Sequence, residues 1–490
     1  MTILLIIDGL QNIMKSNNDW NDKSSKFFIT LTNIHDLALQ SAFVILLCTA
    51  IITDSVNRVL TITHRKRVYL PIASLDPPII IKDDIVTSIF QTDDYIIKML
   101  VNDCGGHGRA LEVLQEILKD RDIQNVNIND MINDLHVRLH DWYCEALMMS
   151  PSEARTIAQA TLTRHLLKFD KHVPSTNKYS DHIVQPELIR YVHESNSSVE
   201  YFDLPYIWIW ILTNSSDSKD PVIRDWLFCD YEDHRSNQNQ TCLSGSHFWQ
   251  HFEHFVFSFH TLKSRNLGDC ELILISSIHI GARLNGDFKF KNHHLELKCA
   301  VHQEDTNSSN YGKGKKEIKC EDKIVDVCEC KYCIINDASA PYGDAFLGLD
   351  VDLKSGKPNE VHQYKRWKVN SLTGQDYQDE RNKSALSKDF FILFTTTNCS
   401  NFKLPKNSGI VDASNWDKYF GPYSGKTHTY ANVGPLNINK ASCRDLRSMY
   451  GIGETQADEI MAKREFKDIE EAKKQTGIPE RVLKRFKFSD

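Results

Sequence analysis

The sequence predicts a multidomain α/β protein of 490 residues that ends in an all-α module. Apolar runs alternate with helical stretches near the N-terminus, and a second series of strand-like runs surrounds a polar helical stretch in the central region. The last residues place a tight glycine turn between two helical segments. The hydrophobic fraction of 41% and the charged fraction of 25% are those of globular proteins, and the length allows several cores. We expect four units, at residues 1–110, 111–245, 246–430 and 431–490.

Charge and cysteine usage restrict the possible partners. The formal net charge of −7 excludes a uniformly basic surface, so a contact with DNA must use a local patch. The longest apolar run, residues 42–52, is shorter than the roughly 20 residues that cross a bilayer. The apolar N-terminus lacks the basic leader and the small-residue cleavage site of a signal peptide, so we expect neither a signal peptide nor a membrane segment. Thirteen unevenly spaced cysteines indicate a reducing compartment.

Residues 1–110 resemble part of a P-loop NTPase of the STAND or AAA+ type. The run Ile3–Ile7, followed by Asp8, resembles a Walker B strand, in which the aspartate lies near magnesium. Arg109, in GGHGRALEVL, is placed like a sensor arginine that reaches a γ-phosphate. No phosphate-binding loop precedes the Walker B strand, so we expect a partial, P-loop-like sheet that does not hydrolyse ATP alone. Either the N-terminus is truncated or the unit survives as an interaction surface.

The sequence of residues 111–245 predicts a helical segment, similar to a lid or a winged helix. One GKT, at residues 425–427, is one residue short of the phosphate-loop spacing. Because no apolar strand leads into this GKT, we interpret it as unrelated to nucleotide binding.

The central segment carries charged residues in the order found in one class of nuclease. Asp344 lies in PYGDAF before a strand-like run, and Gln363 and Lys365 lie in VHQYKRW. A polar helical stretch then leads to the buried run Phe390–Thr397. Alternate residues of a strand point the same way, so Gln363 and Lys365 project together. This order resembles the PD-(D/E)xK, or restriction-endonuclease-like, α/β core.

The resemblance implies a deoxyribonuclease that depends on Mg²⁺ or Mn²⁺. Asp344 and the carbonyl oxygen of Gln363 offer the oxygen ligands that Mg²⁺ prefers, and Glu253 adds a carboxylate from a helix where that superfamily often carries one. The metal and Lys365 would favour a hydroxide nucleophile and stabilise charge on phosphate. Gln363 replaces the usual acid, which removes a negative charge and weakens the expected metal site. A decayed site is therefore a second interpretation.

Two further possibilities stay open in the same unit. Asp287, followed by Glu296 and Lys298, matches the usual pattern of an acidic residue and ExK more closely. However, no helical stretch follows Lys298. A cysteine cluster has spacing that allows a structural zinc site, although its single CxxC and its CxC favour free thiols. The members of this cluster are Cys320, Cys328, Cys330 and Cys333.

The sequence of the last unit predicts a helix-hairpin-helix module. LRSMYGIGETQADEI places a tight Gly-Ile-Gly turn before a helix in which the small residue Ala457 faces its partner. The glycines let the backbone approach a phosphate, and the helix N-terminus offers free N–H groups to the anion. The pattern resembles the module of bacterial competence DNA-uptake proteins, which implies contacts to the backbone of double-stranded DNA without sequence specificity. A structural hairpin or protein-docking module is the alternative. The expected DNA-binding residues are Gly451, Ile452, Gly453, Thr455 and Lys463.

Together, the NTPase remnant, the helical segment and the nuclease-like core resemble the Crinkler and retrotransposon-hot-spot families of eukaryotic effectors. The sequence segments LPYIWIW and WDKYFGPYSG are consistent with this resemblance. It implies an effector that acts on DNA in a nucleus, that of a host cell if the protein is secreted. It also implies a second copy or an NTPase-bearing partner that supplies the missing half. The translocation header of Crinklers is not recognisable in the sequence. A non-catalytic DNA-binding scaffold and an ATP-binding switch are the competing functions.

Overall fold

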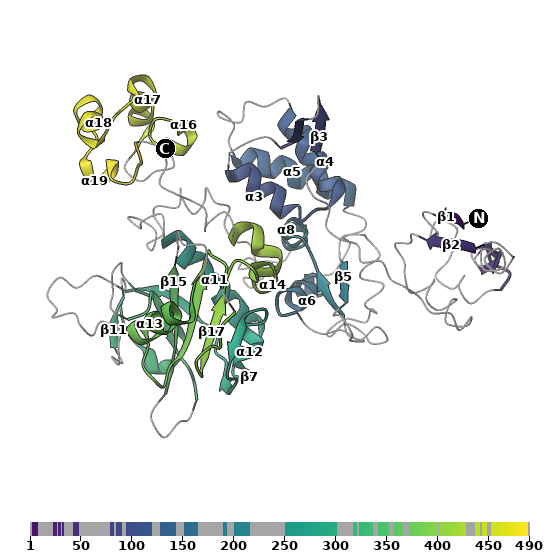
Figure 1. Cartoon of the computed structure of the whole chain (residues 1–490), viewed down its shortest axis with the longest axis horizontal. Coiled ribbons are helices and arrows are strands. Elements are labelled where there is room, and N and C mark those ends of the chain that lie inside the picture. Colours follow the sequence, from purple (N-terminus) through teal and green to yellow (C-terminus); the bar gives the residue numbers. More distant parts are fainter. Residues whose placement is uncertain are drawn as a thin grey trace.

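The fold is described from a computed structural model of the chain (Figure 1). It describes residues 2–7, 23–26, 28–30, 32–33, 43–48, 79–82, 85–90, 95–119, 128–143, 151–164, 190–193, 200–215, 250–300, 317–320, 323–336, 342–351, 357–365, 372–399, 401–427, 437–441, 443–447 and 452–488.

Two parallel strands mark the N-terminal unit. Strand β1 (Thr2–Ile7) pairs in parallel with β2 (Phe43–Cys48), with Thr2 opposite Phe43. Parallel pairing is what the order of strand, helix and strand predicts for this part of the sequence. Strands β3 (Ile79–Lys82) and β4 (Ile85–Ser88) form a separate antiparallel pair. Asp8 lies outside the described residues, so its Walker B role stays a prediction.

A helical unit follows. It consists of α3 (Tyr95–Asp103), α4 (Gly108–Lys119), α5 (Ile128–Tyr143), α6 (Pro151–Leu162), the antiparallel pair β5 (Arg190–His193) and β6 (Glu200–Asp203), and α8 (Tyr206–Ser215). The buried face of α4 packs with α3, α5 and α8 in one hydrophobic core. Helix α4 runs through residue 110, the position at which the sequence analysis placed the boundary between the first two units.

The central unit is built on a sheet whose seven described strands run in the order β10-β13-β14-β15-β16-β17-β8. Strand β14 runs antiparallel to both of its neighbours, β13 and β15, whereas β15, β16 and β17 run in parallel. The elements are α11 (Gln250–Asn266), β7 (Leu272–Leu274), α12 (Ile275–Ile278), β8 (Arg283–Asn285), β9 (Lys289–Lys291), β10 (Glu296–Cys299), β11 (Glu317–Lys319), β12 (Ile324–Asp326), η2 (Val327–Glu329), β13 (Tyr332–Ile335), β14 (Ala345–Gly348), β15 (Asn359–Lys365), α13 (Gly374–Ser384), β16 (Phe390–Thr395), β17 (Ser408–Val411), α14 (Trp416–Phe420) and η3 (Gly421–Tyr423).

Helices cover both faces of this sheet (Figure 1). All six residues of β16 are buried, which confirms the buried strand expected from the run FFILFT. Phe390, Ile392 and Phe394 pack in the core that contains α11, and Phe391 and Leu393 pack in the core that contains α13. The side-chain period of a strand therefore places the residues of β15 alternately toward α11 and toward α13.

Local hydrogen bonds determine where α13 begins. The Thr373 hydroxyl accepts from the backbone N–H of Asp376, whose carboxylate accepts from the backbone N–H of Thr373 at 3.0 Å. This capping box satisfies two donors that a helix start otherwise leaves without partners. Helix α13 thereby starts at a fixed place beside β15.

The helical and central units share one hydrophobic core, and buried cations lie where they meet. Lys263 on α11 is buried, donates to the backbone carbonyl of Tyr419 at 3.3 Å and lies over the ring of that tyrosine. Lys426 is also buried and pairs with Asp103 of α3 at 3.5 Å. The lysine of the GKT segment therefore has a structural partner in the helical unit.

The C-terminal unit is all helical and has its own core. It consists of α16 (Cys443–Arg447), α17 (Glu454–Lys463), α18 (Ile469–Thr476) and α19 (Glu480–Leu483), drawn in yellow in Figure 1. Ala457 is fully buried, which confirms that this small side chain faces a partner helix. Gly477 ends α18 with φ of 67°, a backbone conformation that favours glycine.

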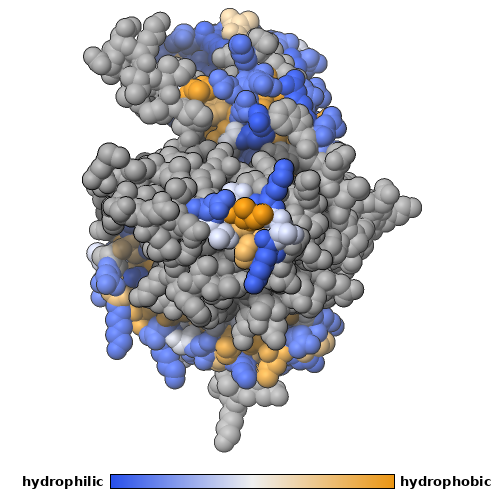
Figure 2. Space-filling model, turned by 90° about the vertical axis from the view of Figure 1, so that its right-hand side faces the viewer, coloured by the Kyte–Doolittle hydropathy of each residue, from blue (hydrophilic) through white to orange (hydrophobic). Residues whose placement is uncertain are grey.

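No described helix is both long and apolar enough to cross a membrane. On the face drawn in Figure 2, hydrophilic residues cover most of the described surface, and hydrophobic residues appear in small groups among them.

Candidate functional site

The site is built around Asp344, which lies just before β14. Its neighbour Gly343 approaches β15 so closely that an added Cβ atom would lie 2.4 Å from Val361 Cγ1 and 2.8 Å from the His362 carbonyl oxygen. The amide of Asn336 also holds this turn by donating to the carbonyls of Tyr342 and Gly343. The glycine in PYGDAF is therefore required so that the aspartate can lie against β15.

Asp344 is bound directly to the QxK strand. Its Oδ2 atom accepts hydrogen bonds from Gln363 Nε2 and from the backbone N–H of Tyr364, each at 2.6 Å. The side-chain oxygen of Gln363 accepts from the Ser384 hydroxyl of α13 at 2.6 Å. The structure thus brings together Asp344 and Gln363, two residues that the sequence analysis paired.

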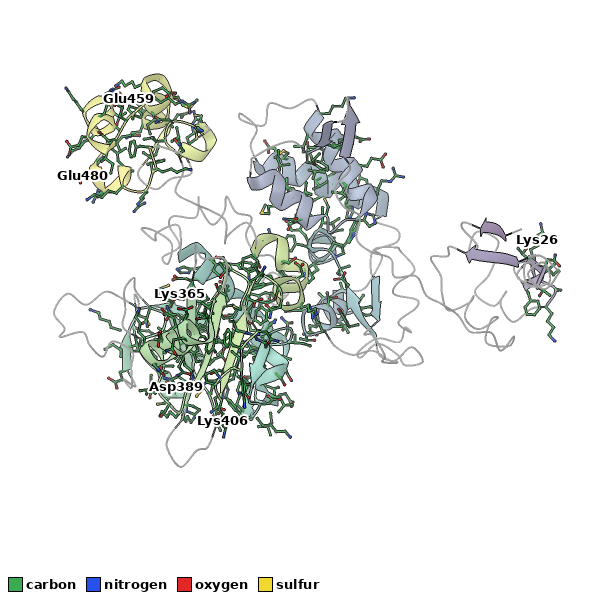
Figure 3. All side chains as sticks on the ribbon, in the orientation of Figure 1. Lys26, Lys365, Asp389, Lys406, Glu459 and Glu480 are labelled. Atoms are coloured by element: carbon green, nitrogen blue, oxygen red, sulfur yellow. The ribbon has the colours of Figure 1, made fainter. Side chains whose placement is uncertain are left out.

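Lys365 lies at the end of β15, at the end of the sheet opposite Asp389 (Figure 3). Its Nζ atom pairs with Glu380 Oε2 of α13 at 3.2 Å, and both side chains are largely shielded from solvent. The sequence analysis did not single out Glu380. The signal in the sequence is its place on the polar helix that follows the QxK strand, one turn before Ser384.

Glu253, on the first turn of α11, completes the group. Burial raises the pKa of Glu253 well above its usual value, and the Asp344 carboxylate raises it further, while Lys365 acts in the opposite direction. Burial likewise raises the pKa of Asp344 to about 6, against the lowering effects of the Tyr364 N–H, Lys365 and Gln363. Two partly buried carboxyl groups therefore influence each other electrostatically, and neither readily carries a charge.

The oxygen donors near Lys365 are of the kind that a hard cation binds. The carboxylates of Glu253, Asp344 and Glu380 each interact electrostatically with Lys365, and oxygen donors are the ligands that Mg²⁺ and Mn²⁺ prefer. The three carboxylates are not among the groups of described side chains whose ligand atoms lie within 4.8 Å of one another, so the structure shows the donors without a closed metal site. Gln363 turns its nitrogen, not its oxygen, toward Asp344. The assignment of amide oxygen and nitrogen follows the hydrogen bonds, and the Ser384 hydroxyl can accept as well as donate. The amide can therefore turn its oxygen inward without losing its bond to Ser384.

The two parts of the rival acidic motif lie far apart in the sheet order. Asp287 lies in the turn between β8 and β9 and accepts from the backbone N–H and the hydroxyl of Ser276, at 3.1 and 2.7 Å. Glu296 and Lys298 lie on β10, with their charged atoms 4.0 Å apart. Strands β8 and β10 are the two opposite edges of the large sheet, so the structure does not pair Asp287 with the strand of Glu296 and Lys298.

The structure also bears on the cysteines and on Arg109. Among the described residues, two groups of His, Cys, Asp or Glu side chains lie close enough to share an ion, and the four clustered cysteines form neither. None of the four forms a disulfide, and burial raises the pKa of Cys330 to about 11. A cysteine-bound zinc therefore has no geometric support. Exposed Arg109 pairs with Glu112 of the same helix.

Helix α17 begins without a side-chain cap. Gly453 precedes the helix and supplies no side-chain acceptor for the N–H groups of the first turn, while its own N–H is bound by the Gln456 side chain at 2.9 Å. Thr455 is exposed at this helix start, and Ile452 is buried in the core of the module. Lys463 lies at the far end of α17, where it donates to the Gln475 carbonyl at 2.7 Å. Gly451 lies outside the described residues.

Comparison with known proteins finds a motif family for the C-terminal unit and a relative that aligns with the whole chain. The helix-hairpin-helix motif family matches residues 431–488, and this motif suggests nucleic-acid binding. The whole chain is 29% identical to Crinkler effector protein 108 of Phytophthora sojae over 519 aligned residues, a match that covers 58% of that relative. The chain therefore spans well under two thirds of the length of this curated relative. No solved structure matches the chain. The similarity supports the expected resemblance to Crinkler effectors.

Proposed function

We propose that this protein is a Crinkler-like effector that cuts DNA in a metal-dependent reaction, with the duplex held by the helix-hairpin-helix. The observation that carries the proposal is the convergence of Glu253, Asp344, Gln363, Lys365 and Glu380 from two helices and two strand ends. Two of these carboxyl groups have raised pKa values, which is common where side chains are arranged for catalysis. The order of α11, β14, β15, α13 and β16 supports a PD-(D/E)xK core.

Each side chain has a proposed task. Asp344 and Glu253 would hold Mg²⁺ or Mn²⁺, with Glu380 and the Gln363 oxygen as further donors. When bound, the metal would make water more acidic and offset charge on the phosphate. Lys365 lies beside these carboxylates and stabilises the negative charge that develops on the phosphate. The hydrogen bond from the backbone N–H of Tyr364 orients the Asp344 carboxylate for this role.

The C-terminal module contributes binding. Residues 433–490 contain twelve Lys and Arg against ten Asp and Glu, a charge of +2 in a chain whose net charge is −7. The open helix start at Gly453 and Thr455 suits a phosphate, and a backbone contact carries no sequence information. We therefore propose double-stranded DNA as the ligand, bound without sequence preference. Acting on DNA places the protein in a nucleus, that of a host cell if it is delivered as an effector.

The test is nicking of supercoiled plasmid by the full chain with Mg²⁺ or Mn²⁺. Wild type is expected to nick the plasmid, and Asp344→Ala and Lys365→Ala are expected to lose activity while still binding DNA. Asp287→Ala is the matched control, because its aspartate belongs to the rival motif and bonds Ser276 instead. Activity that survives in both site variants would refute the proposal.

One observation favours a second function. Gln363 donates to Asp344 in place of an acid that would share a metal, and Ser384 holds its oxygen away from the carboxylate. A decayed site would leave a DNA-binding scaffold. In that case no form of the protein nicks DNA, and deletion of residues 433–490 abolishes binding. Gln363→Glu would then be expected to restore both metal binding and cutting.

A further inference from the structure

A second group of polar side chains lies on the other face of β15, inside the core beneath α11. It consists of His260 on α11, His279 just after α12, and Glu360 and His362 on β15. All four are fully buried, and their candidate ligand atoms all lie within 4.8 Å of one another. Residues two apart on a strand share a face, so Glu360 and His362 point toward α11.

The three imidazoles converge on one carboxylate oxygen. The Nε2 atom of His279 lies 2.9 Å from Glu360 Oε1, and that of His362 is in direct contact with the same oxygen. The Nε2 atom of His260 lies 3.7 Å from it. One oxygen with three ring nitrogens around it is an arrangement in which a small cation can replace the shared hydrogen bonds.

The outer ring nitrogens of two histidines are already oriented. His279 Nδ1 lies 3.1 Å from the Tyr419 hydroxyl, and His362 Nδ1 lies 3.1 Å from the Tyr364 hydroxyl. Metal-bound histidines characteristically use their second nitrogen in this way, which fixes the tautomer and directs the Nε2 lone pair at the ion. The cluster therefore has both an inner set of donors and an outer set of supports.

Hydrogen bonding alone leaves this cluster incomplete. Neither ring nitrogen of His260 has a hydrogen-bond partner, and Glu360 Oε2 also lacks one. Such atoms are costly in a dry core, because burial removes water without replacing its hydrogen bonds. An ion bound by His260 Nε2 and the Glu360 carboxylate would supply the missing interaction for both side chains.

The ligand types select the ion. Imidazole nitrogens favour transition metals over Mg²⁺, and four protein ligands in a closed site are typical of structural zinc. Burial lowers the pKa of His260 and of His362, which keeps these rings in the neutral form that binds metal. One carboxylate offsets part of the charge of a divalent ion.

We propose that His260, His279, Glu360 and His362 bind one structural Zn²⁺ that joins α11, the segment after α12 and β15. The site is separate from the proposed nuclease site, because Gln363 and Lys365 occupy the alternate positions of β15. Its role is to hold α11, and with it Glu253, in place against the sheet.

His260→Gln is the informative variant. Because the His260 ring makes no hydrogen bond, its loss removes a ligand without breaking a hydrogen-bond network. His254→Gln is the matched control, since His254 is a buried histidine of the same helix outside the cluster. Cys330→Ser controls for zinc held by the cysteines.

The first measurement is the zinc content of the full chain after growth with zinc and dialysis, by plasma mass spectrometry. Stoichiometric zinc is expected in wild type, His254→Gln and Cys330→Ser, and its loss, with a lowered Tm, is expected in His260→Gln. Zinc that remains in folded His260→Gln, or zinc-free wild type whose Tm is insensitive to added Zn²⁺ and to chelator, would overturn the proposal.

A second measurement uses wild type alone, in case the variant does not fold. Replacement of the ion by Co²⁺ is expected to give the visible absorption bands of a tetrahedral site with nitrogen and oxygen ligands. Bands with the intense charge transfer of thiolate ligands, or no Co²⁺ uptake, would overturn the proposal. Either result is independent of DNA cutting, so failure of the nuclease proposal leaves this test unaffected.

Discussion

Replacement of Asp344 by asparagine tests the site without relying on catalysis. Both hydrogen bonds to this side chain end on one atom, Oδ2, so the asparagine oxygen can take that place and keep the bonds from Gln363 and Tyr364. The change then removes the charge and little else. It also leaves the electrostatic surroundings of Asp344 in place, namely Glu253 on α11, Lys365 on β15 and Glu380 on α13.

The magnitude follows from the pKa of Asp344, which burial raises from 3.8 to about 6. A raised pKa means that the folded protein binds this proton more tightly than the unfolded chain does. Wild type therefore loses stability as the pH rises from about 4 through about 6. Two pKa units correspond to about 3 kcal/mol, and we expect roughly 1–3 kcal/mol because Asp344 retains some solvent contact. Asp344→Asn should be more stable by this amount above pH 7 and equal to wild type near pH 4.

Scanning calorimetry of the full chain at pH 5 and pH 8, without divalent metal, measures this difference. A stabilisation of roughly 1–3 kcal/mol raises Tm by roughly 2–10 °C for a unit of this size. Added Mg²⁺ should stabilise wild type and leave Asp344→Asn unchanged, because the variant has lost a ligand. Asp379→Asn, which removes an exposed acid of α13, is the control for net charge. A gain in Tm that does not vary with pH would refute the assignment of a buried, strained carboxyl group.

Three further outcomes are expected. Glu380→Gln removes the ion-pair partner of Lys365, so plasmid nicking should fall by about 10–100-fold while DNA binding is kept. Gly343→Val should displace Asp344 from β15, because its first added atom already clashes with Val361, and nicking should be lost with little change in the fluorescence-monitored DNA affinity. Ala457→Leu overfills the core of the helix-hairpin-helix, which costs about 1–3 kcal/mol, and should weaken DNA binding in a titration while Tm of the sheet unit stays the same.

The order of the elements was predictable because each carries a local signal. The run FFILFT identifies a strand buried on both faces, and its alternation between two cores follows from the period of a strand. The Gly-Ile-Gly turn likewise marks the start of α17 from sequence alone. Asp344, Gln363 and Lys365 were found because a strand period and a glycine turn bring residues of nearby sequence together.

The histidine cluster gave no such signal. Its members come from α11, the segment after α12 and β15, and only the tertiary packing of α11 on the sheet brings them together. A clue was present in VHQYK, because it carries polar residues in a strand whose residues between the first and the last are all buried. Polar residues on both faces of a fully buried strand require partners, and His362 on the face opposite Gln363 pointed to a second polar site.

The two groups of polar side chains on β15 explain why this buried strand contains so many polar and charged residues, whose burial is energetically unfavourable without partners. Glu360 and His362 face α11, Gln363 and Lys365 face α13, and each set has its partners on the helix it faces. Glu253 is the exception, because it lies on α11 yet interacts electrostatically with Asp344 and Lys365. Its position depends on how α11 is held against the sheet, and His260 of the same helix is the point where a bound ion would hold it. Zinc loss should therefore weaken Mg²⁺-dependent stabilisation of the Asp344 site even though no zinc ligand touches that site.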